Sequence, residues 1–173
     1  MDAAGLKDLI RDVPDFPKAG ILFRDITPVL ASPEALRASV QAMTEPLREH
    51  DVDCVLGMES RGFLFGPLMA LELEASFVPL RKPGKLPHDV ISESYDLEYG
   101  QDSLEMHSDA IASGQAVAIV DDLIATGGTA AAAIKLAEKA GGRVVGCSFL
   151  IELAALEGRS RLGDRPVHSV LTY

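Results

Sequence analysis

Two patterns of apolar and polar residues alternate along the chain. The segment 32–50 carries apolar residues at the spacing of one helical face: Leu36, Val40, Met43 and Leu47. A serine followed by a proline at its start is typical of the beginning of a helix. Pro46 predicts a kink or a break, because proline lacks the N–H group that an inner turn of a helix requires. We therefore expect a helix that is interrupted close to its end.

Short apolar runs predict buried strands, and helical segments separate them. The predicted strands cover residues 53–58, 76–80, 115–122 and 143–153, and the predicted helices cover 62–75 and 128–140. Gly141 and Gly142 predict the end of the second of these helices. Strands that alternate with helices are typical of parallel βαβ units. The sequence therefore predicts an α/β domain in which helices cover both faces of a parallel sheet.

The pattern changes between the second and the third predicted strand. Residues 94–107 alternate between polar and apolar types on both sides of Gly100, which is typical of a β-hairpin. The hairpin is rich in charge and follows the stretch "KPGKLP". We expect it to form a lid, at about residues 83–107, rather than part of the core. A hairpin without a function is the alternative.

Composition narrows the class of protein. The length of 173 residues and the hydrophobic content of 47% fit one globular domain. The 26 acidic residues outnumber the 16 basic ones, and the net charge of -10 argues against a nucleic acid as the main partner. No apolar run is long enough for a membrane span, and the N-terminus lacks the apolar region of a signal peptide.

The two cysteines suggest a compartment. Cys54 and Cys147 each lie in an apolar, strand-like segment, which favours buried free thiols and a reducing cytoplasm. We therefore expect a cytoplasmic protein. An isolated disulfide between the two cysteines is the alternative.

Two adjacent acids stand immediately before a glycine-rich and threonine-rich loop in "IVDDLIATGGT". The backbone N–H groups of Gly127, Gly128 and Thr129, at the start of a helix, can converge on a phosphate. Neither the lysine of a Walker loop nor a "GxGxxG" fingerprint is present. Asp121 and Asp122 make sense beside a phosphate if they accept hydrogen bonds from ribose hydroxyls and help to place Mg²⁺ through water. A strand-end pair that only caps the loop is the alternative.

These residues resemble a known family. The motif "VDDLIATGGT" is similar to the 5-phosphoribosyl 1-pyrophosphate (PRPP) motif of type I phosphoribosyltransferases. The stretches "FPKAGILFRDITPVL", "GMESRGFLFGPLMA" and "RKPGKLP…YDLEYGQDSLEMH" resemble the adenine-specific members, over nearly the whole chain. The resemblance implies one domain over residues 1–173: a parallel sheet flanked by helices, a small hood mainly at residues 1–30, and a flexible hairpin lid.

The resemblance also implies an activity. The adenine-specific members of the family convert adenine and PRPP to AMP and pyrophosphate in purine salvage, with Mg²⁺ as cofactor. They act as homodimers and have no nucleic acid or membrane partner. The alternatives are a phosphoribosyltransferase for another purine, such as hypoxanthine or guanine, and a regulator that senses PRPP without catalysis. Such regulators usually carry a DNA-binding domain, which the net charge of -10 disfavours.

The resemblance assigns roles to individual residues at the phosphoribosyl and pyrophosphate sites. The phosphate and ribose site comprises Asp121, Asp122, Ala125, Thr126, Gly127, Gly128 and Thr129. The pyrophosphate site comprises Glu59, Ser60, Arg61, Arg81, Lys82 and Lys85. Arg61 would stabilise the departing charge, Arg81 would act in the partner subunit's site, and the family often has a cis peptide bond at the position of Glu59 and Ser60. The alternatives are a surface Arg61 paired with Glu59 and a solvated Lys82.

A further group of residues would bind and protonate the base. Phe23 would stack on adenine while the backbone of Leu22 and Arg24 reads its edge; ordinary core packing of Phe23 is the alternative. Glu98, in the lid, would manage the proton on N7 of the base, and its neighbour Tyr99 would exclude water. At the start of the lid this sequence has His88 where related sequences have a smaller residue; a solvated histidine is the simpler interpretation.

Overall fold

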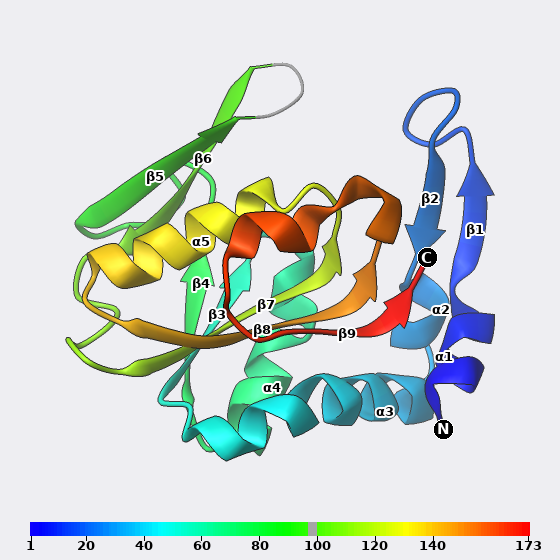
Figure 1. The fold of residues 1–173 in the computed structure, drawn as a ribbon, viewed down its shortest axis with the longest axis horizontal. Coiled ribbons are helices and arrows are strands. Elements are labelled where there is room, and N and C mark those ends of the chain that lie inside the picture. The colour runs from blue at the N-terminus through cyan, green and yellow to red at the C-terminus, as the bar shows by residue number, and fades with distance from the viewer. Residues whose placement is uncertain (97–99) are drawn as a thin grey trace. The chain divides into compact units, whose positions relative to one another are not determined.

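The computed structural model describes residues 1–96 and 100–173 (Figure 1). The chain forms two compact units, Met1–Ala42 and Met43–Tyr173. The predicted hood falls in the first unit, and the predicted sheet and hairpin fall in the second. Among the described residues, no helix is both long enough and apolar enough to cross a membrane.

The first unit consists of short helices and one small antiparallel sheet. Its elements are α1 (Ala3–Leu9), β1 (Arg11–Pro14), β2 (Leu22–Asp25), α2 (Thr27–Leu30) and most of α3 (Pro33–Thr44). β1 and β2 pair in a register that runs from Arg11↔Asp25 to Pro14↔Leu22. The side chain of Ser32 accepts a hydrogen bond from the N–H of Ala35 (3.2 Å), which confirms the predicted helix start. Neither α1 nor the pairing of β1 with β2 was predicted from the sequence.

The predicted break at Pro46 is confirmed. The α-helical backbone of α3 ends at Thr44, and the 3-10 helix Glu45–His50 follows it. Pro46 lies in the first turn of that 3-10 helix, where its missing N–H group leaves no hydrogen bond unmade.

A five-stranded sheet organises the second unit. Its strands are β3 (Cys54–Met58), β4 (Ser76–Leu80), β7 (Ala116–Ile124), β8 (Arg143–Glu152) and β9 (Val167–Thr172). Their order is β4-β3-β7-β8-β9, and every neighbouring pair is parallel. The parallel sheet is therefore confirmed, although the edge strand β9 was not predicted.

Helices cover the two faces of this sheet, as expected. α5 (Gly128–Lys139) lies on one face and α4 (Gly66–Glu72), preceded by the 3-10 helix Arg61–Leu64, lies on the other (Figure 1). Two further 3-10 helices, Ala154–Leu156 and Gly158–Leu162, follow β8. Every residue of β3 is buried, and the first residues of β7 are buried too, which explains their uninterrupted apolar runs. Cys54 and Cys147 are buried free thiols, and burial raises the pKa of Cys147 to about 12.

The predicted hairpin is confirmed, but it is not separate from the core. β5 (Val90–Asp96) and β6 (Gln101–His107) pair antiparallel from Val90↔His107 to Asp96↔Gln101. Leu104 and Met106 point to one face of β6, have no exposed surface, and belong to the same hydrophobic cluster as Leu56 in the central strand β3. The expectation of a lid rather than a core element is therefore wrong for this part of β6. The lid itself stays a prediction.

Candidate active site

A cavity of about 370 Å³ lies at the carboxyl ends of the sheet strands in the second unit. Its lining consists of Met58, Glu59, Ser60, Arg61, Lys82, residues 121–130 and Phe149. Because β3 and β7 are parallel neighbours, the segment after β3 and the segment at the end of β7 meet at one edge of the sheet. The cavity thus brings together two groups of residues that the sequence analysis selected separately.

The loop between β7 and α5 has the geometry of an anion site. Gly127 precedes the first residue of α5 and has a left-handed backbone (φ 79°), and within residues 100–173 no side chain caps this helix. The first hydrogen bond of the helix runs from Ala131 N–H to the Gly127 carbonyl (2.9 Å). The N–H groups before Ala131 therefore lack an intrahelical acceptor, and the helix dipole adds partial positive charge there. Both features favour an anion at this end of the cavity.

The acidic pair lies within the last part of β7, whose pairing with β8 continues to Ile124↔Glu152. The side chain of Asp122 is 3% exposed and accepts a hydrogen bond from Arg61 Nε at 2.5 Å. The N–H of Asp122 donates to Asp121 Oδ1 at 2.9 Å. Burial, and then the charge of Asp122, raise the pKa of Asp121 well above its usual range. The structure pairs Arg61 with Asp122 rather than with Glu59, as the alternative had it.

Glu59 holds the basic loop that follows β4. Its carboxylate accepts hydrogen bonds from Lys85 Nζ (2.7 Å), from the backbone N–H of Lys82 (2.9 Å) and from Arg81 Nε (3.4 Å). Chiefly the hydrogen bond from Lys85, and then those from Lys82 and Arg81, lower the pKa of Glu59 to about 2 against the opposing effect of burial. Glu59 thus positions cations. The peptide bond between Glu59 and Ser60 is cis, as the family resemblance implied.

Lys82 connects the cavity to the hairpin. Its ammonium group donates to the Tyr95 hydroxyl (2.7 Å) in β5 and to the Asp102 carboxylate in β6. Burial lowers the pKa of Lys82, but these hydrogen bonds outweigh it and raise the pKa above its usual range. The alternative of a merely solvated Lys82 is therefore wrong. Arg81 does not line the cavity; it contacts Glu59 and the Lys85 carbonyl (3.3 Å) of its own chain.

The residues predicted to bind the base lie elsewhere in the chain. Leu22, Phe23 and Arg24 form most of β2 in the first unit. The Phe23 ring packs edge to face on Phe16, with 5.1 Å between ring centroids, and Arg24 forms an ion pair with Asp12. Glu98 and Tyr99 lie outside the described residues. Their roles, and the roles of Leu22, Phe23 and Arg24, stay predictions.

The remaining observations concern residues around these predicted groups. His88 is exposed, and its ring centroid lies 6.0 Å from that of His107.

Several apolar residues that line the cavity were not predicted as site residues: Met58, Leu123, Ile124, Ala130 and Phe149. Met58, Leu123 and Ile124 lie inside the quoted motifs and Ala130 directly follows one, so their positions next to a strand end could have revealed them. Phe149 comes from β8 and carries no such signal.

Comparison with known proteins identifies the class to which this fold and cavity belong. The model of the phosphoribosyl transferase domain matches residues 28–170. The chain therefore belongs to the phosphoribosyltransferase family, and its parallel sheet with flanking helices is the type I fold of that family.

Relatives narrow the assignment to one branch of the family. The adenine phosphoribosyltransferase of Rhodopirellula baltica is 57% identical over 168 residues, which cover 97% of this chain and 82% of that protein. The crystal structure of the adenine phosphoribosyltransferase from Rhodothermus marinus is 57% identical, has a TM-score of 0.94, and the match covers 99% of this chain and 98% of that one. The Saccharomyces cerevisiae enzyme, solved with an imino-altritol bisphosphate and adenine, is 43% identical, with a TM-score of 0.92 over 97% of each chain.

The hydrogen bonds of Glu59 predict a pH-dependent contribution to stability. A carboxyl group whose folded-state pKa is about 2 stabilises the fold above its unfolded pKa and loses that contribution as the pH falls toward 2. Glu59→Gln should therefore lower the free energy of unfolding by about 1–3 kcal/mol at pH 7, and the difference from the parent should shrink below about pH 4.5. Urea unfolding at pH values from 7 to 3 measures this difference. Glu49→Gln, at an exposed glutamate, is the control, and a loss in Glu59→Gln that does not vary with pH would contradict the assignment.

Proposed function

We propose that this protein transfers the phosphoribosyl group of PRPP to adenine, forming AMP and pyrophosphate in purine salvage. The observation that carries the proposal is the cavity in which an uncapped helix start, an acidic pair with a buried Asp122 and an arginine line one space. The 57% identity to the adenine phosphoribosyltransferase of Rhodopirellula baltica supports the choice of adenine. The free buried cysteines support a cytoplasmic location.

The loop at the start of α5 holds the 5′-phosphate. The backbone N–H groups of Gly127, Gly128 and Thr129 donate to its oxygens, and the hydroxyl groups of Thr126 and Thr129 add donors of their own. The left-handed backbone of Gly127 supports this assignment, because it turns the chain directly into the helix. Ala125 contributes to the wall of the same site.

The acidic pair binds the ribose rather than the phosphate. The carboxylate of Asp122 is fixed by Arg61 and can accept hydrogen bonds from a ribose hydroxyl. Asp121 lies beside Asp122 in β7 and can accept a hydrogen bond from the second ribose hydroxyl. Departure of pyrophosphate leaves positive charge on the ribose ring, and the negative charge of Asp122 stabilises that charge.

The cations around the cavity receive the pyrophosphate. Arg61 donates to Asp122 through Nε, and the planar guanidinium has further N–H donors suited to phosphate oxygens. Lys82 lines the cavity, and Lys85 is held beside it by Glu59. Glu59 also binds Arg81, which we assign to the pyrophosphate site of the partner subunit. Glu59 and Ser60 then shape the pyrophosphate site, with Glu59 acting through the cations that it binds.

The residues of the cavity fit Mg²⁺ that is held mainly by the substrate. Among the described residues there is no group of three or more His, Cys, Asp or Glu side chains that could hold a metal ion. Asp121 and Asp122 offer a carboxylate pair, which is the typical protein contribution to a Mg²⁺ site completed by water and phosphates. When bound, the ion would neutralise charge on the pyrophosphate group.

The base site completes the proposal. Phe23 stacks on the adenine ring, the backbone groups of Leu22 and Arg24 hydrogen-bond to its edge, and Glu98 handles the proton on N7. The support for these roles is the similarity of "ILFRD" and "LEYG" to the adenine-specific members of the family. With Tyr99, the part of the lid at about residues 83–107 that does not pack in the core excludes water, which would otherwise capture the reactive sugar.

A panel of purine bases tests this function. Adenine presents N1 as an acceptor and a 6-amino donor, whereas hypoxanthine and guanine present N1–H and a 6-oxo acceptor. Because each mismatch with a fixed backbone group costs about 1–3 kcal/mol, adenine should exceed both in kcat/KM by up to roughly 10⁴-fold. Chromatography of the nucleotides formed from PRPP, Mg²⁺ and each base measures the ratio, and Arg24→Ala should leave it nearly unchanged. Equal efficiency with hypoxanthine would refute the base site, and PRPP binding without any nucleotide would indicate a regulator.

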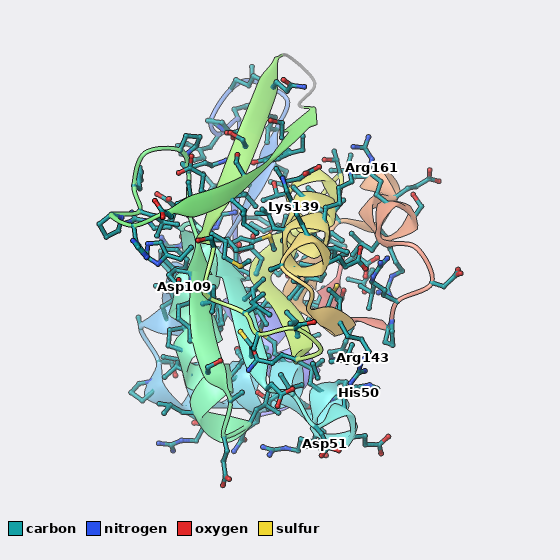
Figure 2. The ribbon with its side chains drawn as sticks, turned by 90° about the vertical axis from the view of Figure 1, so that its left-hand side faces the viewer. His50, Asp51, Asp109, Lys139, Arg143 and Arg161 are labelled. Atoms are coloured by element: carbon teal, nitrogen blue, oxygen red, sulfur yellow. The ribbon has the colours of Figure 1, made fainter. Side chains whose placement is uncertain are left out.

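A second prediction concerns the acidic pair. Asp122→Asn should lower kcat by about 10²-fold and weaken PRPP binding, because the amide lacks the charge that faces the ribose ring. Steady-state kinetics with circular dichroism measures both activity and folding. Asp109→Asn is the control, since Asp109 is exposed and does not line the cavity (Figure 2). If the double variant that combines Asp121→Asn with Asp122→Asn turned over like the parent, the acids would not bind the ribose.

We also propose that the protein is a homodimer in which Arg81 serves the partner's site. Leu64, Leu68 and Leu71 follow the spacing of one helical face before and within α4, and their exposed fractions are 41%, 37% and 78%. Exposed apolar residues in such a row are typical of an interface. Arg81 contacts Glu59 of its own chain at the margin of the cavity. In a dimer, its guanidinium would leave this contact and bind pyrophosphate in the neighbouring chain's site.

Mixing of two impaired variants tests this arrangement. Arg81→Ala chains and Asp122→Asn chains should regain partial activity together, because one of the two sites in a mixed dimer is intact. Differently tagged chains reveal the mixed dimers, and Leu71→Glu in both chains should abolish the recovery by disrupting the interface. No recovery in verified mixed dimers would place Arg81 in its own subunit's site.

A further inference from the structure

The 3-10 helix Gly158–Leu162 lies beside α5 (orange-red in Figure 1) and does not line the cavity. Its last residue, Leu162, is 1% exposed and belongs to the hydrophobic core. Gly158 is buried as well, although residues 154–157 before it and 159–161 after it are exposed. A buried glycine inside an exposed segment indicates close contact between two stretches of backbone.

The second stretch of backbone is residues 125–129, the loop after β7 with the first two residues of α5, which we call the phosphate-binding loop. A Cβ atom on Gly158 would overlap the carbonyl oxygen of Ala125 and lie 2.8 Å from the backbone nitrogen of Gly127. A Cβ atom on Gly127 would in turn overlap the carbonyl oxygen of Gly158. Gly158 does not have a left-handed backbone, so the lack of space alone requires glycine there. The position of Gly158 therefore limits where the loop can lie.

Arg159 fixes the position of Gly158. Its guanidinium donates twice to the carboxylate of Glu152, from Nε (3.1 Å) and from Nη2 (2.5 Å). It also donates to the carbonyl of Val167 (2.5 Å) and to the hydroxyl of Ser169 (3.4 Å), both in β9. The Glu152 side chain is only 13% exposed, and Glu152 ends β8. A two-pronged contact of this kind fixes orientation as well as distance, which an ordinary surface ion pair does not.

We propose that Arg159 and Gly158 are positioning residues for the phosphate-binding loop. Arg159 binds Glu152 at the end of β8 and Val167 and Ser169 in β9, and Gly158 is pressed against Ala125 and Gly127. The proposal rests on the proposed function, because it assumes that this loop holds the 5′-phosphate. Several N–H groups must converge on one phosphate, so a small displacement of the loop weakens all of these hydrogen bonds together. Neither residue lines the cavity, so both act through the loop.

A pair of matched variants tests the role of Arg159. Arg159→Gln and Arg161→Gln each remove one positive charge from the same 3-10 helix, and Arg161 is exposed (Figure 2). Arg159→Gln should raise the KM for PRPP and the Kd for AMP by about tenfold with a smaller change in kcat, whereas Arg161→Gln should match the parent. The KM for adenine should stay nearly constant, since the residues proposed to bind the base, Leu22, Phe23 and Arg24, belong to β2 and not to this loop. Calorimetric titration with AMP and with PRPP measures affinity independently of catalysis.

Further variants separate positioning from general destabilisation. Arg159→Lys keeps the charge but not the two-pronged contact, so its affinity for PRPP should lie between those of Arg159→Gln and the parent. Gly158→Ala should weaken PRPP and AMP binding in the same direction as Arg159→Gln. Thermal unfolding identifies how much folded protein each sample contains, and affinities are compared per folded molecule.

Two results would overturn the proposal. One is equal PRPP and AMP affinity in the two glutamine variants. The other is a uniform loss in kcat and in both KM values that follows the loss of folded protein. Failure of the proposed function would look different, because the parent itself would then form no AMP from adenine and PRPP.

Discussion

Parallel pairing of β3 with β7 is the constraint on which the candidate site depends. Gly57 lies opposite Val120 in this register, so the segment that begins at Glu59 emerges beside Asp121 and Asp122, about sixty residues further along the chain. There is no room for a side chain on Gly62, because a Cβ atom there would lie 2.9 Å from the Val120 carbonyl oxygen. A shift of one residue in this pairing would reverse the face to which every side chain of the strand points. It would separate Arg61 from Asp122 and bury charge in the core.

Each cation described around the cavity has an acidic partner from the same chain. Asp122 binds Arg61, Glu59 binds Arg81 and Lys85, and Asp102 binds Lys82. This pairing explains how a chain with a net charge of -10 keeps a cluster of cations close together without strong mutual repulsion. An incoming polyanion therefore competes with carboxylates for these cations. The loop at the start of α5 differs, because its donors are backbone N–H groups that carry no formal charge.

Features that depend on local sequence could be predicted, and features that depend on distant contacts could not. The sheet strands β3, β4, β7 and β8, the break at Pro46 and the start of α5 after Gly127 follow from apolar periodicity or from the properties of single residues. The contact between Arg61 and Asp122 could not be predicted, because Asp122 is distant in the sequence and Glu59 is close. Only the register of the sheet brings Asp122 to Arg61. The same reason applies to Leu104 and Met106, whose burial depends on how β6 packs. The buried Gly158 shows no sequence pattern that distinguishes it from other loop glycines.

The contacts of Lys82 couple the state of the cavity to the hairpin. One ammonium group lines the cavity and also binds Tyr95 in β5 and Asp102 in β6. Any ligand that changes the contacts of this group changes the free energy of the hairpin, and any movement of the hairpin changes the affinity for that ligand by the same factor. A spectroscopic label on β5 should therefore change its signal when an anion in the cavity alters the contacts of Lys82, although the label does not touch the anion.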